Sequence, residues 1–271
     1  MRSLLLFLIL VLSTFFLHAQ CLKVCSWNIA NLGKSKDATE IAYISKKIKD
    51  FDFVGIQEVS TSPAGAQAVA KIVDNLNRSG SSWEYIVSDP TNGNGPERYA
   101  FLWKKSKAKM IKKAWIEKSL DKQIDREPYL GVFVAAKDTF LIANFHAVPK
   151  GKNPDLETCQ LYKIDEMYEK YHFMIIGDFN SAPKSMGFGS LLKRNVLNTF
   201  SSQKTTLKQE PSKTGEKFAS EYDNIFYEVD EIVLNDKGII DTSLDFPDLK
   251  TARKISDHIP VWGCYSVKKK K

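Results

Sequence analysis

Residues able to carry acid–base and metal chemistry recur where apolar segments of the sequence end. Asn28 closes one apolar segment, Glu58 follows the next beside Gln57, and His146 closes a third. Asp178 and Asn180 follow another apolar segment, whereas Asp223, and Asp257 with His258, stand directly before apolar segments. If these segments are strands of shared sheets, their carboxylates, amides and two histidines gather on one rim, where functional side chains are commonly found.

This collection of side chains suits the hydrolysis of a phosphate ester. Its hard oxygen donors are ligand types that Mg²⁺, Mn²⁺ or Ca²⁺ prefer and zinc does not; they are Asn28, Glu58, Asp178 and Asp257. A divalent ion neutralises charge on the phosphoryl oxygens. Two histidines allow one general base and one general acid, because imidazole titrates near neutral pH. A single aspartate or histidine near the end of a strand is usually structural, so the prediction depends on all of these residues occurring together.

The elements that must position these residues alternate between strand and helix patterns. Helical periodicity covers residues 37–49, where Asp37 and Glu40 have capping-box spacing, a segment opened by Ser62-Pro63, and residues 156–170. Apolar runs typical of strands cover residues 22–29, 53–56, 83–87, 99–103, 130–135, 140–146, 173–176, 224–229 and 259–265. The pattern predicts one α/β domain over residues 20–267, with packed sheets flanked by helices.

The first 19 residues have the pattern of a secretory signal peptide. A positive start at Arg2 precedes an apolar run over residues 4–17, and we expect cleavage after Ala19. One alternative is a membrane anchor, for which the apolar run is short; another is a lipoprotein acylated at Cys21. We expect secretion to the periplasm or the extracellular space, with no stable membrane insertion of the mature chain.

The composition is that of an ordinary globular protein, with 43% hydrophobic and 26% charged residues, which excludes a disordered or collagen-like chain. The formal net charge is +7. Without Arg2 and a basic C-terminal tail at residues 268–271, the body has 34 positive and 32 negative residues, so its charge says little about a nucleic-acid partner. The lysine-rich segment 104–118 is either a hairpin whose lysines protect an edge strand, which we favour, or a flank that attracts phosphate.

The four cysteines, Cys21, Cys25, Cys159 and Cys264, have no zinc-binding spacing. In a secreted protein an even number of cysteines permits disulfides, although a domain of this size does not require them. Cys25 and Cys264 fall on the first and last predicted strands. We expect these two to pair if those strands are neighbours.

Five short motifs occur in an order that resembles the endonuclease/exonuclease/phosphatase superfamily. They are SWNI at 26–29, IQEV at 56–59, GDFN at 177–180, YDNI at 222–225 and SDHIP at 256–260. Four further segments resemble the deoxyribonuclease I branch of this superfamily: VSDP at 87–90, ERYAFLW at 97–103, REP at 126–128 and HAVP at 146–149. The resemblance implies a four-layer α/β sandwich: two mixed β-sheets packed face to face, with helices outside.

The resemblance also implies roles for the motif residues. His258, steadied by Asp223, would be the general base, and His146, steadied by Glu97, the general acid. The metal ligands would be Glu58, Asn28, Asp257 and Asp178, the last two holding either the metal or the attacking water.

Three residues are implied to bind the scissile phosphate: Arg126, whose planar fork matches phosphate oxygens, Asn180 and Thr205. The resemblance departs at Ala30 and Ser60, where the mammalian digestive enzyme of this branch places arginines that enter the DNA minor groove. A preference for duplex DNA is therefore not implied.

Together these observations predict a secreted, divalent-metal-dependent endonuclease that acts on DNA, and on RNA as a second substrate. We expect a monomer that uses Mg²⁺, with Mn²⁺ or Ca²⁺ as alternatives. One rival is another hydrolase of the superfamily: a sphingomyelinase, or a phosphoinositide or sugar-phosphate phosphatase. A rival of another class is a catalytically inactive binding protein on the same fold, against which the intact set of candidate catalytic residues argues.

Overall fold

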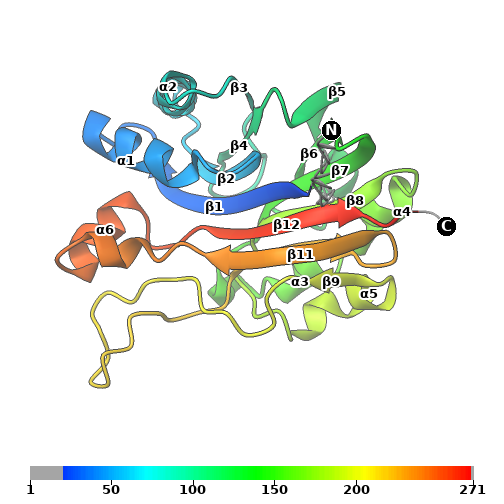
Figure 1. Ribbon diagram of the computed structural model, residues 1–271. Helices are drawn as coiled ribbons and strands as arrows, with labels where there is room; N and C mark the ends of the chain where they lie inside the picture. Colours follow the sequence, from blue (N-terminus) through cyan, green and yellow to red (C-terminus); the bar gives the residue numbers. More distant parts are fainter. Residues whose placement is uncertain (1–20, 270–271) are drawn as a thin grey trace, which may run out of the picture.

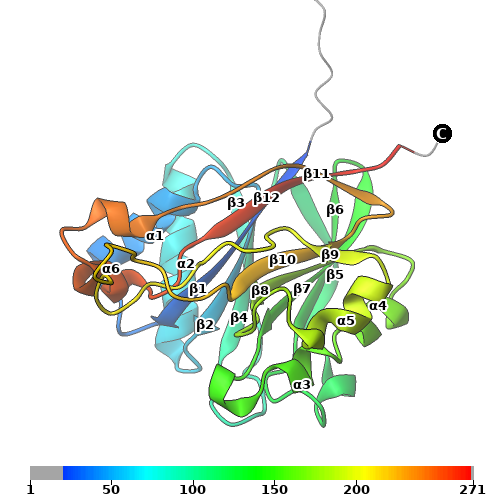
Figure 2. The same ribbon diagram turned by 90° about the horizontal axis from the view of Figure 1, so that it is seen from below.

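Two six-stranded mixed sheets pack face to face, and helices cover both outer faces (Figure 1 and Figure 2). This is the four-layer α/β sandwich that the sequence predicts. The computed structural model describes residues 21–269. The expected signal peptide at residues 1–19, and the last two lysines of the basic tail, lie outside the described residues.

The first sheet has the strand order β11-β12-β1-β2-β4-β3. Its strands are β1 (Leu22–Leu32), β2 (Phe53–Val59), β3 (Trp83–Val87), β4 (Arg98–Lys104), β11 (Ile232–Ile239) and β12 (Val261–Val267). β1 and β2 are parallel, and the other neighbours are antiparallel. The carboxyl ends of β1 and β2 therefore meet at one edge.

The second sheet has the strand order β5-β6-β7-β8-β10-β9. Its strands are β5 (Ala108–Ile116), β6 (Tyr129–Ala135), β7 (Asp138–His146), β8 (His172–Asp178), β9 (Val196–Asn198) and β10 (Asp223–Glu228). β7 and β8 are its parallel pair. β5 is an edge strand with Lys109, Lys112 and Lys113 exposed, which confirms the edge-strand interpretation of the lysine-rich segment.

The helices divide between the two outer faces (Figure 1). They are α1 (Ala38–Ile48), α2 (Pro63–Arg78), α3 (Asp155–Thr158), α4 (Tyr162–Met167), α5 (Gly189–Lys193) and α6 (Leu249–Ile255). α1 begins with the predicted capping box, in which Asp37 and Glu40 each accept the other's backbone N–H. None of the described helices is long and apolar enough to cross a membrane.

The single helix predicted over residues 156–170 is wrong, because the chain forms α3 and α4 with a turn between them. After α3 the backbone N–H groups of Gln160 and Leu161 bond three residues back, to the carbonyls of Glu157 and Thr158, which interrupts the α-helical pattern. Glu157 itself is buried. Its carboxylate accepts the backbone N–H groups of Val148 and Asp125 at 2.7 Å each, which fixes α3 against two neighbouring loops.

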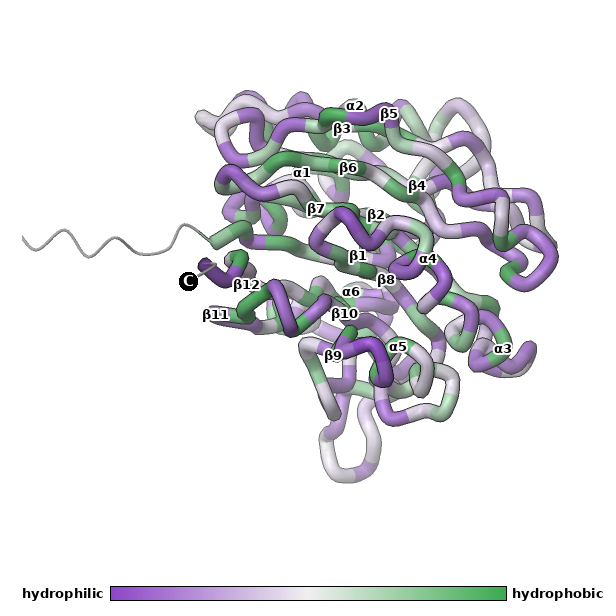
Figure 3. The backbone as a smooth tube through the Cα atoms, turned by 90° about the vertical axis from the view of Figure 1, so that its right-hand side faces the viewer, coloured by the Kyte–Doolittle hydropathy of each residue, from purple (hydrophilic) through white to green (hydrophobic). Residues whose placement is uncertain are grey.

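The main core lies between the sheets and is rich in aromatic rings, among them Phe53, Phe101 and Phe133. Hydrophobic colour is concentrated along the central strands in Figure 3, whereas the outer loops are largely hydrophilic. Near the edge where β1 and β2 end, Gly55 brings the sheets together. A Cβ at this position would stand 2.3 Å from Ile176 Cδ1, so any larger residue would require the Ile176 side chain to shift.

The predicted disulfide between Cys25 and Cys264 is wrong, because Cys264 pairs with Cys21. β1 and β12 are neighbours as expected, but their register places Cys25 opposite Trp262. Cys25 is fixed inside its strand and buried in the apolar cluster beneath α1 and α2. Cys21 precedes the strand, and its Cα lies 5.4 Å from that of Cys264.

Candidate active site

Strand register places three of the predicted side chains next to one another at one sheet edge. His146 ends β7 directly opposite Asp178, which ends β8, and Asp223 begins β10 on the other side of Asp178. The first sheet contributes Asn28 from β1 and Glu58 from β2. The site is therefore built where the two sheets meet at their shared edge.

Asp178 lies at the centre of the site and is almost completely buried. Its Oδ2 accepts a hydrogen bond from Asn28 Nδ2 at 3.0 Å, and lies 3.4 Å from His146 Nε2 and 3.5 Å from His258 Nε2. Its Oδ1 accepts the backbone N–H of Asn180. Burial opposes ionisation, but the two imidazoles outweigh it and lower the pKa of Asp178.

His146 is held from behind by a carboxylate. Its Nδ1 lies 2.8 Å from Glu97 Oε2, and the same oxygen accepts a hydrogen bond from the Arg126 guanidinium at 3.0 Å. Arg126 also donates to the Ala147 carbonyl, which accepts the side-chain amide of Asn180 as well. Burial disfavours the charged imidazole, yet Glu97 and Asp178 outweigh it and raise the pKa of His146.

His258 is held in the same manner by a different carboxylate. Its Nδ1 lies 2.8 Å from Asp223 Oδ2, and Thr205 Oγ1 donates to that oxygen at 2.7 Å. Burial would lower the pKa of His258, but the charges of Asp223 and Asp178 raise it to about 10. Thr205 is fully buried behind Asp223, so the structure does not bring its hydroxyl to the surface where the sequence analysis expects a phosphate contact.

Glu58 adopts a backbone conformation that is unusual for a residue with a long side chain. Its φ is +58°, in the left-handed region, which costs an L-residue about 1–2 kcal/mol. The β1–β2 pairing shifts register here, and the Glu58 N–H donates to Glu97 at 3.2 Å. Its carboxylate accepts from Asn28 Nδ2 and from the Asn31 N–H, each at 3.0 Å. These contacts hold the strained conformation, as is common at functional sites.

Asn28 and Glu58 offer oxygen donors of the kind that a hard divalent cation binds, although the Asn28 amide presents its Nδ2, not its Oδ1, to Glu58. Asn28 Oδ1 is buried and accepts no hydrogen bond from any residue between 21 and 269, so a carbonyl oxygen remains for a ligand. Asp257, also predicted as a ligand, is half-buried, pairs with Arg253 at 3.3 Å, and makes no hydrogen bond to the other predicted ligands. A second group, Asp178, Asp223 and His258, has ligand atoms within 4.8 Å of one another. In that group, His258 Nδ1 and Asp223 already bind each other.

A buried polar network lies beneath the site, which the sequence analysis did not identify. Asn144, inside β7, accepts a hydrogen bond from Gln57 at 2.6 Å and donates to the carbonyls of Ile56 and Ala100. Gln57 also donates to Ser26. An asparagine within an otherwise apolar strand was the available sequence signal. The network joins the two sheets directly under Asn28 and Glu58.

The paired histidines at the edge of a four-layer sandwich are the defining features of this molecule. The sequence profile of the Endonuclease/Exonuclease/phosphatase family matches residues 25–258, so the chain belongs to this family. A deoxyribonuclease of Thioalkalivibrio sp. (strain K90mix) is 28% identical over 265 residues, which cover 89% of this chain and 70% of that protein. Human deoxyribonuclease gamma is 27% identical over 273 residues, 90% of this chain and 85% of that protein.

Solved structures of low sequence identity share the fold. The crystal structure of D. rerio TDP2 complexed with a single-strand DNA product superposes with a TM-score of 0.66 at 17% identity. The match covers 91% of this chain and 99% of that one. The similarity confirms the architecture of the two sheets and their helices.

Proposed function

We propose that this protein is a secreted, divalent-metal-dependent endonuclease that hydrolyses phosphodiester bonds of DNA, with RNA as a second substrate. The observation that carries this proposal is the convergence of two buried imidazoles on one carboxylate oxygen. Each imidazole has its own carboxylate at 2.8 Å on the opposite ring nitrogen. The deoxyribonuclease names of the relatives support DNA as the substrate.

His258 acts as the general base. Asp223 holds the Nδ1–H, and Nε2 faces the reacting centre beside Asp178. Because the pKa of His258 is raised to about 10, Nε2 must first lose its own proton, and it can then accept one from water. The water oxygen forms a new bond to phosphorus as its proton passes to Nε2. Asp178, fixed by Asn28 and by the Asn180 N–H, orients that water.

His146 acts as the general acid. Glu97 holds its Nδ1, so the Nε2–H can protonate the departing oxygen when the old P–O bond breaks. Arg126 donates a hydrogen bond to Glu97, and Asn180 donates one to the carbonyl of Ala147, the residue after His146. Both side chains therefore lie beside this histidine, and we propose that they contact the phosphate. The negative charge of Asp178 attracts both imidazoles, which keeps the two rings at the reacting centre.

Glu58 and Asn28 would hold a divalent cation, Mg²⁺ or alternatively Mn²⁺ or Ca²⁺. When bound, that cation supplies charge neutralisation at the phosphoryl oxygens. The ligand role of Asp257 remains a prediction, because its carboxylate pairs with Arg253.

Secretion and a monomeric state are also part of the proposal. The disulfide between Cys21 and Cys264 supports an oxidising compartment, since disulfides rarely persist in the cytosol. This bond also occupies the Cys21 sulfur that a lipoprotein anchor would require.

The test uses the mature chain with Mg²⁺, Mn²⁺, Ca²⁺ or EDTA. Supercoiled plasmid, single-stranded DNA, RNA, sphingomyelin and a sugar phosphate are offered separately. We expect internal cleavage of DNA that EDTA abolishes. Release of phosphate or phosphocholine from the small or lipid substrates, with every nucleic acid left intact, would contradict the proposal and favour a phosphatase or sphingomyelinase.

A further inference from the structure

A hollow of about 480 Å³ opens beside the site, on the side of Glu58 and Glu97. Three buried or half-buried site residues, Glu58, Glu97 and Arg126, form its floor. The remaining lining comprises Asn31, Lys34, Ser35, Val59, Ser60, Thr61, Gly95 and Pro96. Its volume lies within the usual range for small-molecule sites.

The lining has hydrogen-bonding groups that are not engaged elsewhere. Among residues 21–269, no hydrogen bond or ion pair involves the side chains of Asn31, Lys34 or Thr61. At the floor, Arg126 Nε is buried and also has no partner within the described residues. No aromatic ring lines the hollow, so its occupant is not held by base stacking.

The distribution of charge indicates which part of a nucleic acid occupies the hollow. Glu58 and Arg126 at the floor belong to the proposed cation and scissile-phosphate sites, and Glu97 is paired with Arg126, whereas hydroxyl and amide groups on the walls can bind the neutral sugar next to that phosphate. Lys34 lies at the exposed rim, where its ammonium can meet the next phosphate along the strand.

We propose that the hollow is a subsite for one sugar of an unpaired strand, with Lys34 on the adjacent phosphate. This inference rests on the proposed nuclease function. A phosphate reaching His146 and Asp178, which are 4% and 1% exposed, must descend below the rim. A single strand bends into such a recess easily, but a duplex must bend or unpair locally. The enzyme therefore prefers single-stranded over double-stranded substrate.

The experiment measures binding of a labelled oligonucleotide, single-stranded or annealed, to the His146→Ala variant by fluorescence anisotropy at several salt concentrations. We expect the single strand to bind at least about tenfold more tightly than the duplex, given the cost of local unpairing. Adding Lys34→Ala should weaken single-strand binding and reduce the slope of log K against log salt by about 0.7, the value for one phosphate contact.

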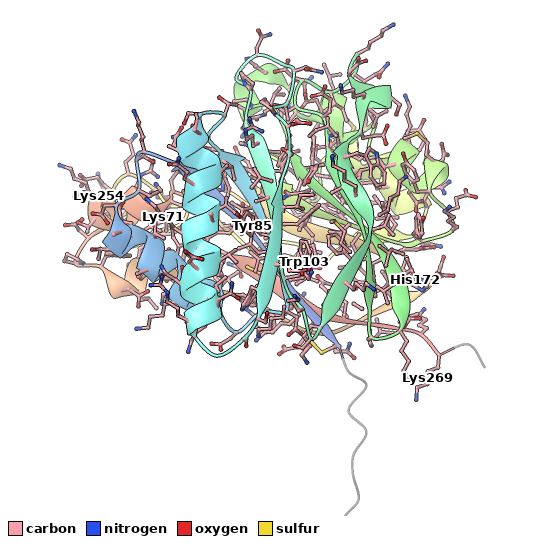
Figure 4. All side chains as sticks on the ribbon, turned by 90° about the horizontal axis from the view of Figure 1, so that it is seen from above. Lys71, Tyr85, Trp103, His172, Lys254 and Lys269 are labelled. Carbon is pink, nitrogen blue, oxygen red and sulfur yellow. A yellow bond between two sulfur atoms is a disulfide. The ribbon has the colours of Figure 1, made fainter. Side chains whose placement is uncertain are left out.

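Lys71→Ala is the matched control, because Lys71 is an exposed lysine of α2 (Figure 4) that does not line the hollow. It should leave binding unchanged. Thr61→Trp fills the hollow and should weaken binding of the single strand more than binding of the duplex. Equal or tighter duplex binding, or no effect of Lys34→Ala, would overturn the subsite.

Cleavage by the wild-type chain separates the two proposals. If both strand forms are cut with equal efficiency, the subsite assignment is wrong and the nuclease assignment stands. If neither is cut while a sugar phosphate is hydrolysed, the proposed function itself is wrong.

Discussion

Replacing Asp223 by asparagine tests how the second histidine is held. Asp223 Oδ2 lies 2.8 Å from His258 Nδ1 and accepts from Thr205 at 2.7 Å. An asparagine amide has the same shape, but its NH₂ group would face Nδ1 and favour the tautomer that carries the proton on Nε2. That nitrogen could then no longer accept a proton from water.

A general base contributes about 10²–10⁴-fold to a rate, so we expect Asp223→Asn to lower kcat by that factor. This corresponds to about 3–5 kcal/mol in the activation free energy. The assay is initial-rate plasmid nicking with saturating divalent metal, accompanied by circular dichroism and a melting curve.

Asp165→Asn is the matched control, because Asp165 is another buried carboxylate, bonded to Arg194 on the outer face and not to either catalytic histidine. It should retain the wild-type rate. A folded Asp223→Asn variant within tenfold of the wild-type kcat would refute the role of Asp223.

Three further predictions concern stability. Cys21→Ser removes a disulfide between residues 243 positions apart, and in the chain-entropy model it should lower the free energy of unfolding by about 5 kcal/mol; an unchanged melting temperature would contradict this. Asn144→Ala removes one of the two hydrogen bonds that Gln57 donates, together with the side-chain donor to two buried carbonyls, and should cost about 3 kcal/mol in urea denaturation, with less than 1 kcal/mol refuting it. Burial opposes the ionisation of Glu117, but hydrogen bonds from Tyr168, Trp115 and Ser119 outweigh it and lower its pKa; its stabilising contribution is therefore full above the ordinary glutamate pKa of 4.5 and is lost as pH falls through the lowered pKa. The difference in unfolding free energy between wild type and Glu117→Gln should shrink with acidification, and a difference independent of pH would contradict the assignment.

The motifs predicted the two histidine–carboxylate pairs because each motif is short and lies at one end of a buried strand. His146, Asp178 and Asp223 become neighbours through strand register alone, since β7, β8 and β10 are adjacent. Apolar runs also predicted most strands. β9 and β11 were missed: β9 has only three residues, and exposed polar residues interrupt the apolar pattern of β11.

Features that depend on three-dimensional packing could not be read from the sequence. The pairing of Cys264 depends on which cysteine lies at a free strand end, and the break after Thr158 depends on where Glu157 finds its partners. Thr205 was placed correctly near the site, but only its burial shows that its hydroxyl supports Asp223.

Metal-dependent cleavage of plasmid by three single-histidine variants is the most direct test of the central claim. His172 (labelled in Figure 4) begins β8, at the opposite end of this strand from Asp178, so His172→Ala is the control. We predict that His146→Ala and His258→Ala each lose at least about 10²-fold in kcat, whereas His172→Ala retains it. Wild-type turnover in a folded His146→Ala or His258→Ala variant would contradict the paired-histidine mechanism.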